Sequence, residues 1–144
     1  MMEDEVLFFQ EFSIMGKDFS NAGTVSTQIK SILKEIGFDP VIVRRAAIAA
    51  YEAEMNVVMY AERGVVRLRV TPDKIRIELE DEGQGIEDIE LAMQEGYSTA
   101  TPEMREMGFG AGMGLPNIKR NSDHFEITSE PGKGTKLNIV INAR

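Results

Sequence analysis

The sequence predicts a single α/β domain, and three features lead to this prediction. The first half of the chain contains two helical patterns, the second of them apolar on nearly every side. Two pairs of alternating strands, each joined by a short turn, follow at 64–80 and 124–141. A chain of 144 residues with 42% hydrophobic content can bury one substantial core. We therefore expect one domain over residues 1–144.

Composition excludes several classes of protein. The net charge of −8 argues against non-specific binding to nucleic acid or to anionic membranes. Without cysteine the chain has no disulfide, thiolate nucleophile or cysteine metal site. The single histidine, His124, excludes a histidine-rich metal centre, and we interpret it as a structural or surface residue. The N-terminus is acidic rather than signal-like and no apolar run is long enough for a membrane, so we expect a cytoplasmic protein.

The chain begins with a strand and two helices. Residues 6–15 are short, apolar and rich in aromatic side chains, and Gly16 ends this predicted strand. A helix capped by Asp18 or Ser20 is expected to run to Ile36, because apolar residues recur on one face. The pair Asp39–Pro40 is a typical N-cap and first residue of a second helix, at about 40–62.

Polar groups interrupt this second, largely apolar helix. Glu52 and Asn56 are four residues apart and share a face, whereas Glu54 points about 200° away from Glu52. This face could simply lie at the surface. Alternatively, the Asn56 side-chain oxygen suits Mg²⁺ and Glu52 could serve as a base.

The first glycine-rich segment, 80–86, follows the hairpin formed by 64–70 and 74–80. Its Asp81 is expected just after the strand, as a carboxylate acceptor beside the unobstructed backbone of Gly83 and Gly85. Such a site would suit a flat heterocycle with an exocyclic amine. The alternative is that these residues simply form a turn, in which Asp and Gly are common.

The second glycine-rich segment, 108–114, leads directly into a predicted helix at 115–121. Unobstructed backbone N–H groups before a helix N-terminus make an anion site, although a flexible connection is the alternative. Between the two segments we expect a short helix at 87–95 and a loop at 96–107 that could act as a lid. A second hairpin, 124–129 and 135–141, completes the chain.

Taken in order, these motifs resemble the ATP-binding domain of the GHKL superfamily. They are Glu-x-x-x-Asn on a buried helix, Asp-x-Gly-x-Gly after a hairpin, a lid, Gly-x-Gly-x-Gly before a helix, and Gly-x-Gly-Thr in the last hairpin. The compact chain is similar to the bacterial anti-sigma regulatory factor serine/threonine kinases, in particular to their switch-kinase branch. The resemblance implies a Bergerat-type two-layer α/β sandwich, with a mixed β-sheet and helices on one face.

The resemblance also implies a role for each matching residue. Glu52 would be the catalytic base, Asn56 would bind the Mg²⁺ that bridges the ATP phosphates, and Asp81 would accept a hydrogen bond from the adenine amine. Gly83 and Gly85 would let the backbone approach the base, and Thr135 would close the adenine pocket. The glycines expected to wrap the phosphates are Gly108, Gly110, Gly112 and Gly114.

The implied function is phosphorylation of a STAS-domain partner protein, with regulation by partner switching that involves a sigma factor or a phosphatase. A homodimer is a further possibility. Alternatives are a non-catalytic module that senses ATP or ADP, and an ATPase of the gyrase or chaperone kind. Two features depart from the family pattern: Tyr60 stands where many of these kinases carry histidine, and residues 101–107 lengthen the loop.

Overall fold

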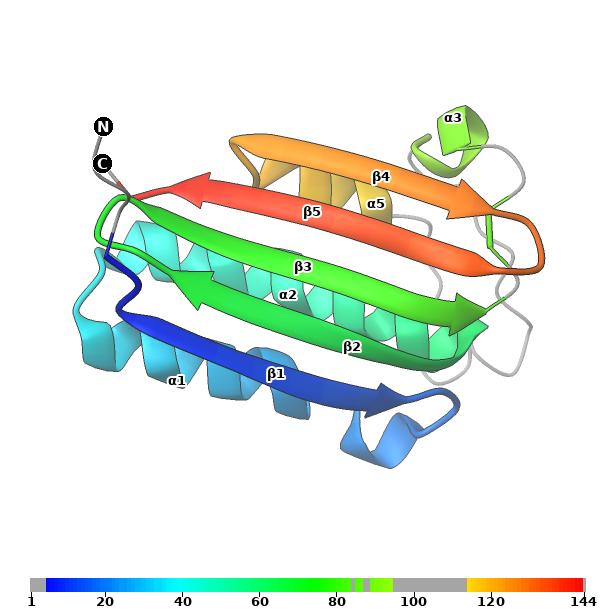
Figure 1. Cartoon of the computed structure of the whole chain (residues 1–144), viewed down its shortest axis with the longest axis horizontal. Helices are drawn as coiled ribbons and strands as arrows, with labels where there is room; N and C mark the ends of the chain where they lie inside the picture. The colour runs from blue at the N-terminus through cyan, green and yellow to red at the C-terminus, as the bar shows by residue number, and fades with distance from the viewer. Residues whose placement is uncertain (1–4, 84, 87–88, 95–113, 144) are drawn as a thin grey trace.

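A five-stranded sheet with helices on one face makes up the fold (Figure 1). The computed structural model describes residues 5–83, 85–86, 89–94 and 114–143. The strands follow the spatial order β1-β2-β3-β5-β4. Their bounds are β1 Phe8–Met15, β2 Ala61–Val70, β3 Lys74–Gly83, β4 His124–Glu130 and β5 Gly134–Asn142. The helices are the 3₁₀ helix η1 Phe19–Asn21, α1 Thr24–Ile36, α2 Pro40–Tyr60, α3 Ile89–Ala92 and α5 Gly114–Arg120.

The two-layer α/β sandwich is confirmed, but its sheet is not mixed. All four neighbouring strand pairs in the described part of the chain are antiparallel. The two hairpins each place consecutive strands antiparallel. Strands that run in the same direction are never neighbours, because β2 separates β1 from β3, and β5 separates β3 from β4. The expectation of a mixed sheet is therefore wrong.

The two long helices form because each has an apolar face to bury against the sheet. On α1 that face is Val25, Ile29 and Leu33. On α2 small residues let the helix pack closely on its neighbours, and it is buried along most of its length. The core lies between α2 and the inward side chains of the sheet, such as Leu68, Ile77 and Ile139.

The first two helices each differ from the prediction at one end. The first helix begins at Thr24 rather than at Asp18 or Ser20, because residues 19–21 form a separate 3₁₀ turn. The second helix starts as predicted, with Asp39 Oδ1 accepting the Val41 N–H at 2.9 Å. It ends at Tyr60, two residues early, because the chain passes directly into β2.

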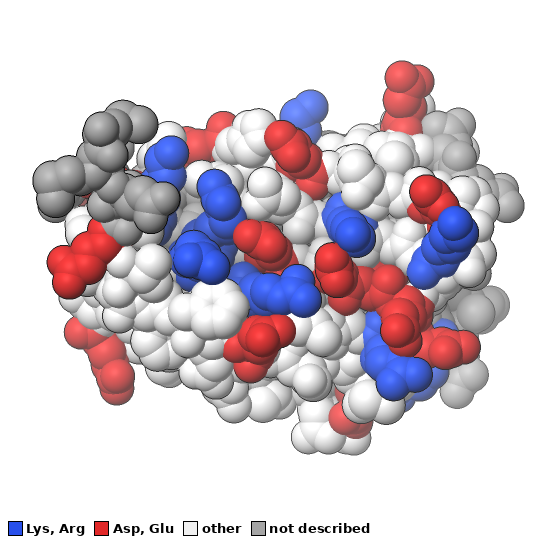
Figure 2. All heavy atoms as spheres, viewed as in Figure 1, with Lys and Arg blue, Asp and Glu red and all other residues white. Residues whose placement is uncertain are grey.

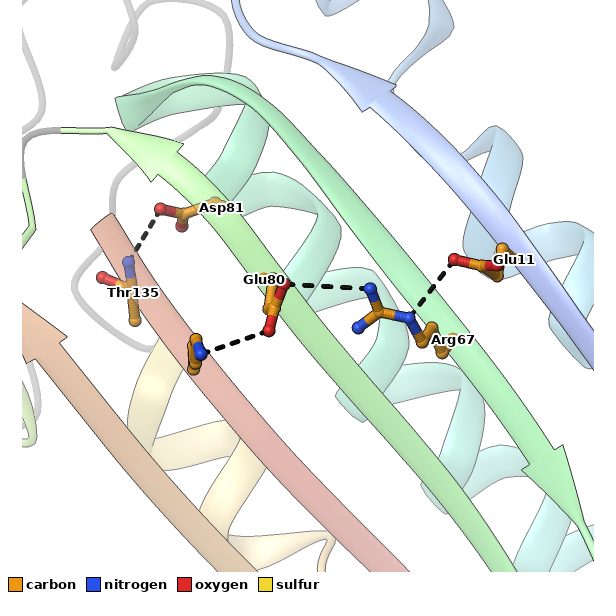
Figure 3. A network of polar contacts seen from close by, with 6 residues as sticks. Glu11, Arg67, Glu80, Asp81 and Thr135 are labelled. Atoms are coloured by element: carbon orange, nitrogen blue, oxygen red, sulfur yellow. Dashed lines mark hydrogen bonds and ion pairs between the residues drawn. The ribbon is translucent and has the colours of Figure 1, made fainter. Parts of the chain in front are cut away.

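The face of the sheet turned away from the helices carries charges of both signs (Figure 2). Some of these charges form salt bridges between neighbouring strands. Arg67 pairs with Glu11 at 3.2 Å and with Glu80 at 3.8 Å, and Glu80 also pairs with Lys136 at 3.3 Å (Figure 3). His124 lies on this surface beside Glu126, at 2.8 Å, so it is a surface histidine as predicted. None of the described helices is both long and apolar enough to cross a membrane.

Candidate nucleotide site

Helix α2 presents Glu52 and Asn56 one turn apart on a half-buried face. Gly114, the first residue of α5, lies against both side chains. A Cβ atom at Gly114 would be 3.4 Å from Asn56 Oδ1 and 3.9 Å from Glu52 Oε1. The structure thus brings the end of the second glycine-rich segment to the two polar residues of α2, as the nucleotide hypothesis requires.

The Glu52 carboxylate is held by a residue that the sequence analysis did not single out. Asn117 of α5 donates from Nδ2 to Glu52 Oε2 at 2.8 Å. Asn117 Oδ1 in turn accepts a hydrogen bond from Arg120 at 3.2 Å. Its position three residues after the last glycine, on the first turn of a helix entering the site, is the signal that could have identified it. Asn117 fixes the orientation of Glu52.

Glu54, two residues after Glu52, has an entirely different environment. It is only 2% exposed. Its Oε2 accepts the N–H groups of Gly23 at 3.0 Å and Val25 at 3.2 Å, and its Oε1 accepts that of Ser26 at 2.9 Å. These are free N–H groups at the start of α1, where the N-cap residue is a glycine without a capping side chain. Glu54 is therefore a helix cap supplied from a distant part of the chain.

Asp81 and Thr135 meet at the other end of the site (Figure 3). Asp81 Oδ1 accepts the Thr135 backbone N–H at 3.0 Å. Burial raises the pKa of Asp81, and the hydrogen bond from Thr135 opposes this shift. Contrary to the prediction, Asp81 and Gly83 lie within β3 rather than after it, because β3 stays paired with β2 as far as Gly83.

Gly83 and Gly85 are both needed for close packing of the chain on itself. A Cβ at Gly83 would lie 3.0 Å from Ala61 Cα and 3.1 Å from the Tyr60 carbonyl oxygen. One at Gly85, where φ is +74°, would overlap the Glu130 carbonyl. Packing alone thus accounts for both glycines, and an approach of their backbone to a base stays a prediction.

Ser129, also missed by sequence reasoning, ties this turn to the last hairpin. Its hydroxyl accepts the Ile86 N–H at 2.8 Å, donates to the Gly134 carbonyl at 3.0 Å and lies 2.9 Å from Thr135 Oγ1. A serine just before a hairpin turn was the available signal. The network fixes Thr135 beside Asp81.

The two halves of the site lie along one end of α2. Gly83 contacts Tyr60, which is one turn beyond Asn56 on that helix. Gly108, Gly110 and Gly112, and the loop at 96–107, lie outside the described residues. Within the described ranges, no three His, Cys, Asp or Glu side chains are grouped to hold a metal ion. A cation here would take Asn56 as protein ligand and phosphate or water oxygens otherwise, which suits Mg²⁺.

The chain is similar to a known protein family and to several known proteins. The family described as "Histidine kinase-like ATPase domain" matches residues 17–141. The serine/threonine-protein kinase RsbT of Bacillus subtilis is 33% identical over 115 residues, which are 77% of this chain and 80% of the relative. An anti-sigma F factor of Caldanaerobacter subterraneus is 40% identical over 109 residues, 71% of this chain and 73% of the relative.

A solved structure is similar over nearly the whole chain. The RsbU and RsbW domains of a Mycobacterium tuberculosis protein align with a TM-score of 0.60 at 18% identity. The alignment covers 94% of this chain and 33% of that longer one. At this level of identity the likeness establishes a shared fold.

Proposed function

The chain belongs to the histidine kinase-like ATPase domain family, and from this premise we propose that it is an ATP-dependent protein serine/threonine kinase that acts by partner switching. The observation that carries the proposal is the meeting of Glu52, Asn56 and Gly114, the residues that the motif assigns to base, cation and phosphates. The names of two relatives, a serine/threonine kinase and an anti-sigma factor, agree with both parts of the proposal.

Glu52 is the proposed catalytic base. A seryl or threonyl oxygen of the partner attacks the γ-phosphorus of ATP, its proton passes to Glu52, and the bond between the γ-phosphorus and the bridging oxygen breaks to release ADP. The hydrogen bond from Asn117 keeps the carboxylate in one orientation. Most of the rate enhancement in such transfers comes from positioning and charge stabilisation.

Asp81 is the proposed adenine acceptor. Its Oδ1 is occupied by the Thr135 N–H, and Oδ2 has no hydrogen bond to any residue in the described ranges, so it can accept from an exocyclic amine. Thr135, held by Ser129, would close the same pocket. When bound, Mg²⁺ would neutralise phosphate charge, and Asn56 is the residue that would hold it.

The proposed substrate is a STAS-domain protein, and a sigma factor or a phosphatase is the proposed partner released or captured by the switch. The similarity to a kinase and to anti-sigma factors supports this class of partner. The roles of Gly108, Gly110 and Gly112 in wrapping the phosphates, and the homodimer, belong to the same proposal.

Two measurements test this function. Calorimetric titration with ATP, with and without Mg²⁺, measures binding. Transfer of labelled γ-phosphate to STAS-domain proteins of the same genome measures kinase activity. Asn56→Ala should bind ATP without the Mg²⁺ dependence of the wild type. Glu52→Gln should bind ATP normally but transfer phosphate at least about a hundredfold more slowly. Glu35→Gln, on the exposed side of α1, is the matched control. Normal transfer by Glu52→Gln would refute its role as base, and binding without transfer by the wild type would favour a nucleotide-sensing module.

A further inference from the structure

A groove of about 540 Å³ lies between α1, α2 and α5, and Glu52 forms part of its wall. The other residues that matter here are Thr27 and Lys30 of α1, Arg44 and Tyr51 of α2, and Asn117 of α5. On α2, Arg44, Tyr51 and Glu52 lie along one face, since they are seven and eight residues apart. The groove therefore continues directly from the proposed catalytic base.

The groove is lined by two cations, Lys30 and Arg44, and one carboxylate, Glu52, on a protein that is acidic overall. Lys30 and Arg44 approach it from two different helices, and neither forms an ion pair with another residue of the described part of the chain. By contrast, the neighbouring Arg45 is paired with Asp123 at 3.2 Å. Tyr51 is 41% exposed, which makes it available for contact with a bound chain. Two available cations and an aromatic ring are suited to an acidic polypeptide.

We propose that this groove binds an acidic segment of the protein substrate and delivers its serine or threonine hydroxyl to Glu52, an inference that rests on the kinase function proposed above. Lys30 and Arg44 pair with the acidic side chains of that segment and thereby select the substrate. Tyr51 packs against it.

The geometry around Glu52 explains why the acceptor approaches from this side. Its Oε1 faces Gly114, where phosphates are expected, and its Oε2 is bound by Asn117, which also lines the groove. A general base must come within about 3 Å of the hydroxyl that it deprotonates. A chain lying in the groove can reach the carboxylate without crossing the position of Gly114.

Binding of fluorescent peptides tests the proposal directly. The probes are a serine peptide flanked by Asp and Glu, and the same peptide with Asn and Gln in their place, each measured by anisotropy with the ATP-bound Glu52→Gln protein. The acidic peptide should bind more tightly, and its affinity should fall as salt is added. The double variant Lys30→Glu, Arg44→Glu in the same background should weaken its binding by at least about tenfold.

Lys34→Glu is the matched control, because Lys34 is an exposed residue of α1 outside the groove. It should leave peptide binding unchanged, and circular dichroism should show that all variants are folded. Equal affinity for both peptides, no binding of either, or an unchanged affinity in the double variant would overturn the proposal. A loss of ATP affinity in the double variant would also overturn it, since the cations would then serve the nucleotide.

This outcome is separable from failure of the proposed function. If the wild type does not bind ATP, the kinase proposal fails, and the groove proposal fails with it because it rests on that function. If the wild type binds ATP and phosphorylates a protein while charge reversal at Lys30 and Arg44 leaves the KM for that protein unchanged, only the groove proposal fails.

Discussion

Glu52 and Glu54 show how two residues of the same type, two positions apart on α2, acquire different tasks from their surroundings. The Glu52 carboxylate is half-buried, borders a groove and accepts a side-chain hydrogen bond from Asn117. The Glu54 carboxylate is buried and accepts three backbone N–H groups at the start of α1. Only Glu52 is placed to meet a substrate, and Glu54 joins α1 to α2.

We predict that Glu54→Gln destabilises the protein by about 1–3 kcal/mol, because the charged acceptor at the N-terminus of α1 is lost and an amide N–H₂ replaces one acceptor oxygen. The free energy of unfolding in urea measures this effect. Glu52→Gln is the control and should change it by less than about 0.5 kcal/mol. Equal losses in both variants would contradict the capping role.

Asp81→Asn should move stability and affinity in opposite directions. Burial raises the pKa of Asp81, so the ionised carboxylate is disfavoured in the folded protein and its cost grows as the pH rises through that pKa. Asn keeps an oxygen for the Thr135 N–H and carries no charge, so the unliganded variant should be at least as stable as the wild type at neutral pH.

The same substitution should weaken ATP binding roughly tenfold to a hundredfold, because the asparagine side chain can present its N–H₂ donor to the adenine amine where Asp81 presents an acceptor. Thermal unfolding and calorimetric titration together measure the two effects. A variant that is destabilised and still binds ATP normally would contradict the assignment of Asp81.

At the scale of elements, Asp123 joins both layers of the fold. It pairs with Arg45 of α2 at 3.2 Å, and its Oδ2 accepts the N–H of Asn142, the last residue of β5, at 2.7 Å. The hydrogen bond from Asn142 lowers the pKa of Asp123, and Arg45 contributes in the same direction against desolvation. This contact fixes the end of the sheet relative to the helix that carries the site.

A lowered pKa predicts a particular pH dependence for this contact. The stabilisation is fully present above the unfolded-state pKa, near 3.8, and is lost as the pH falls through the lower folded-state pKa. Asp123→Asn should therefore be less stable than the wild type at neutral pH, by under about 1 kcal/mol for a partly exposed pair. The difference should vanish in acid. A difference that persists at the lowest pH of a urea titration series would contradict this prediction.

The turn that contains Gly85 packs against the turn between β4 and β5, at the Glu130 carbonyl. Gly85→Ala should cost at least about 2 kcal/mol, because it combines a positive φ with overlap of the Glu130 carbonyl. Gly132→Ala is the control, since its φ of +81° is also positive but no atom lies within 4 Å of the added Cβ. It should cost only about 1 kcal/mol. Similar losses in urea unfolding would show that the two turns do not depend on this contact.

At the scale of the whole molecule, ATP binding should stabilise the folded protein against unfolding. A site assembled from α2, β3, α5 and β5 exists only in the folded chain, so ATP should raise the free energy of unfolding by about 2.7 kcal/mol at a hundredfold excess over Kd. Differential scanning calorimetry at several ATP concentrations, with and without Mg²⁺, measures the shift. The Asp81→Asn variant should shift less at equal concentrations, and an equal shift would indicate binding elsewhere.

The sequence alone determined the types of the strands and α-helices and most of their bounds to within two residues. The alternation in 64–80 and 135–141, the Asp39–Pro40 start and the spacing of Glu52 and Asn56 are local patterns, and the structure confirms each of them. Such features depend on helix and strand periodicity and on capping, which neighbouring residues fix by themselves.

Only the tertiary structure decided which strands are neighbours and which polar groups act together. Strand order depends on how β5 inserts between β3 and β4, which no local pattern encodes. Likewise, helix periodicity separates Glu52 from Glu54 but cannot say which of them is buried. That assignment follows from the long-range contacts of Glu54 with the start of α1 and of Glu52 with Asn117, because burial is a property of the packed molecule.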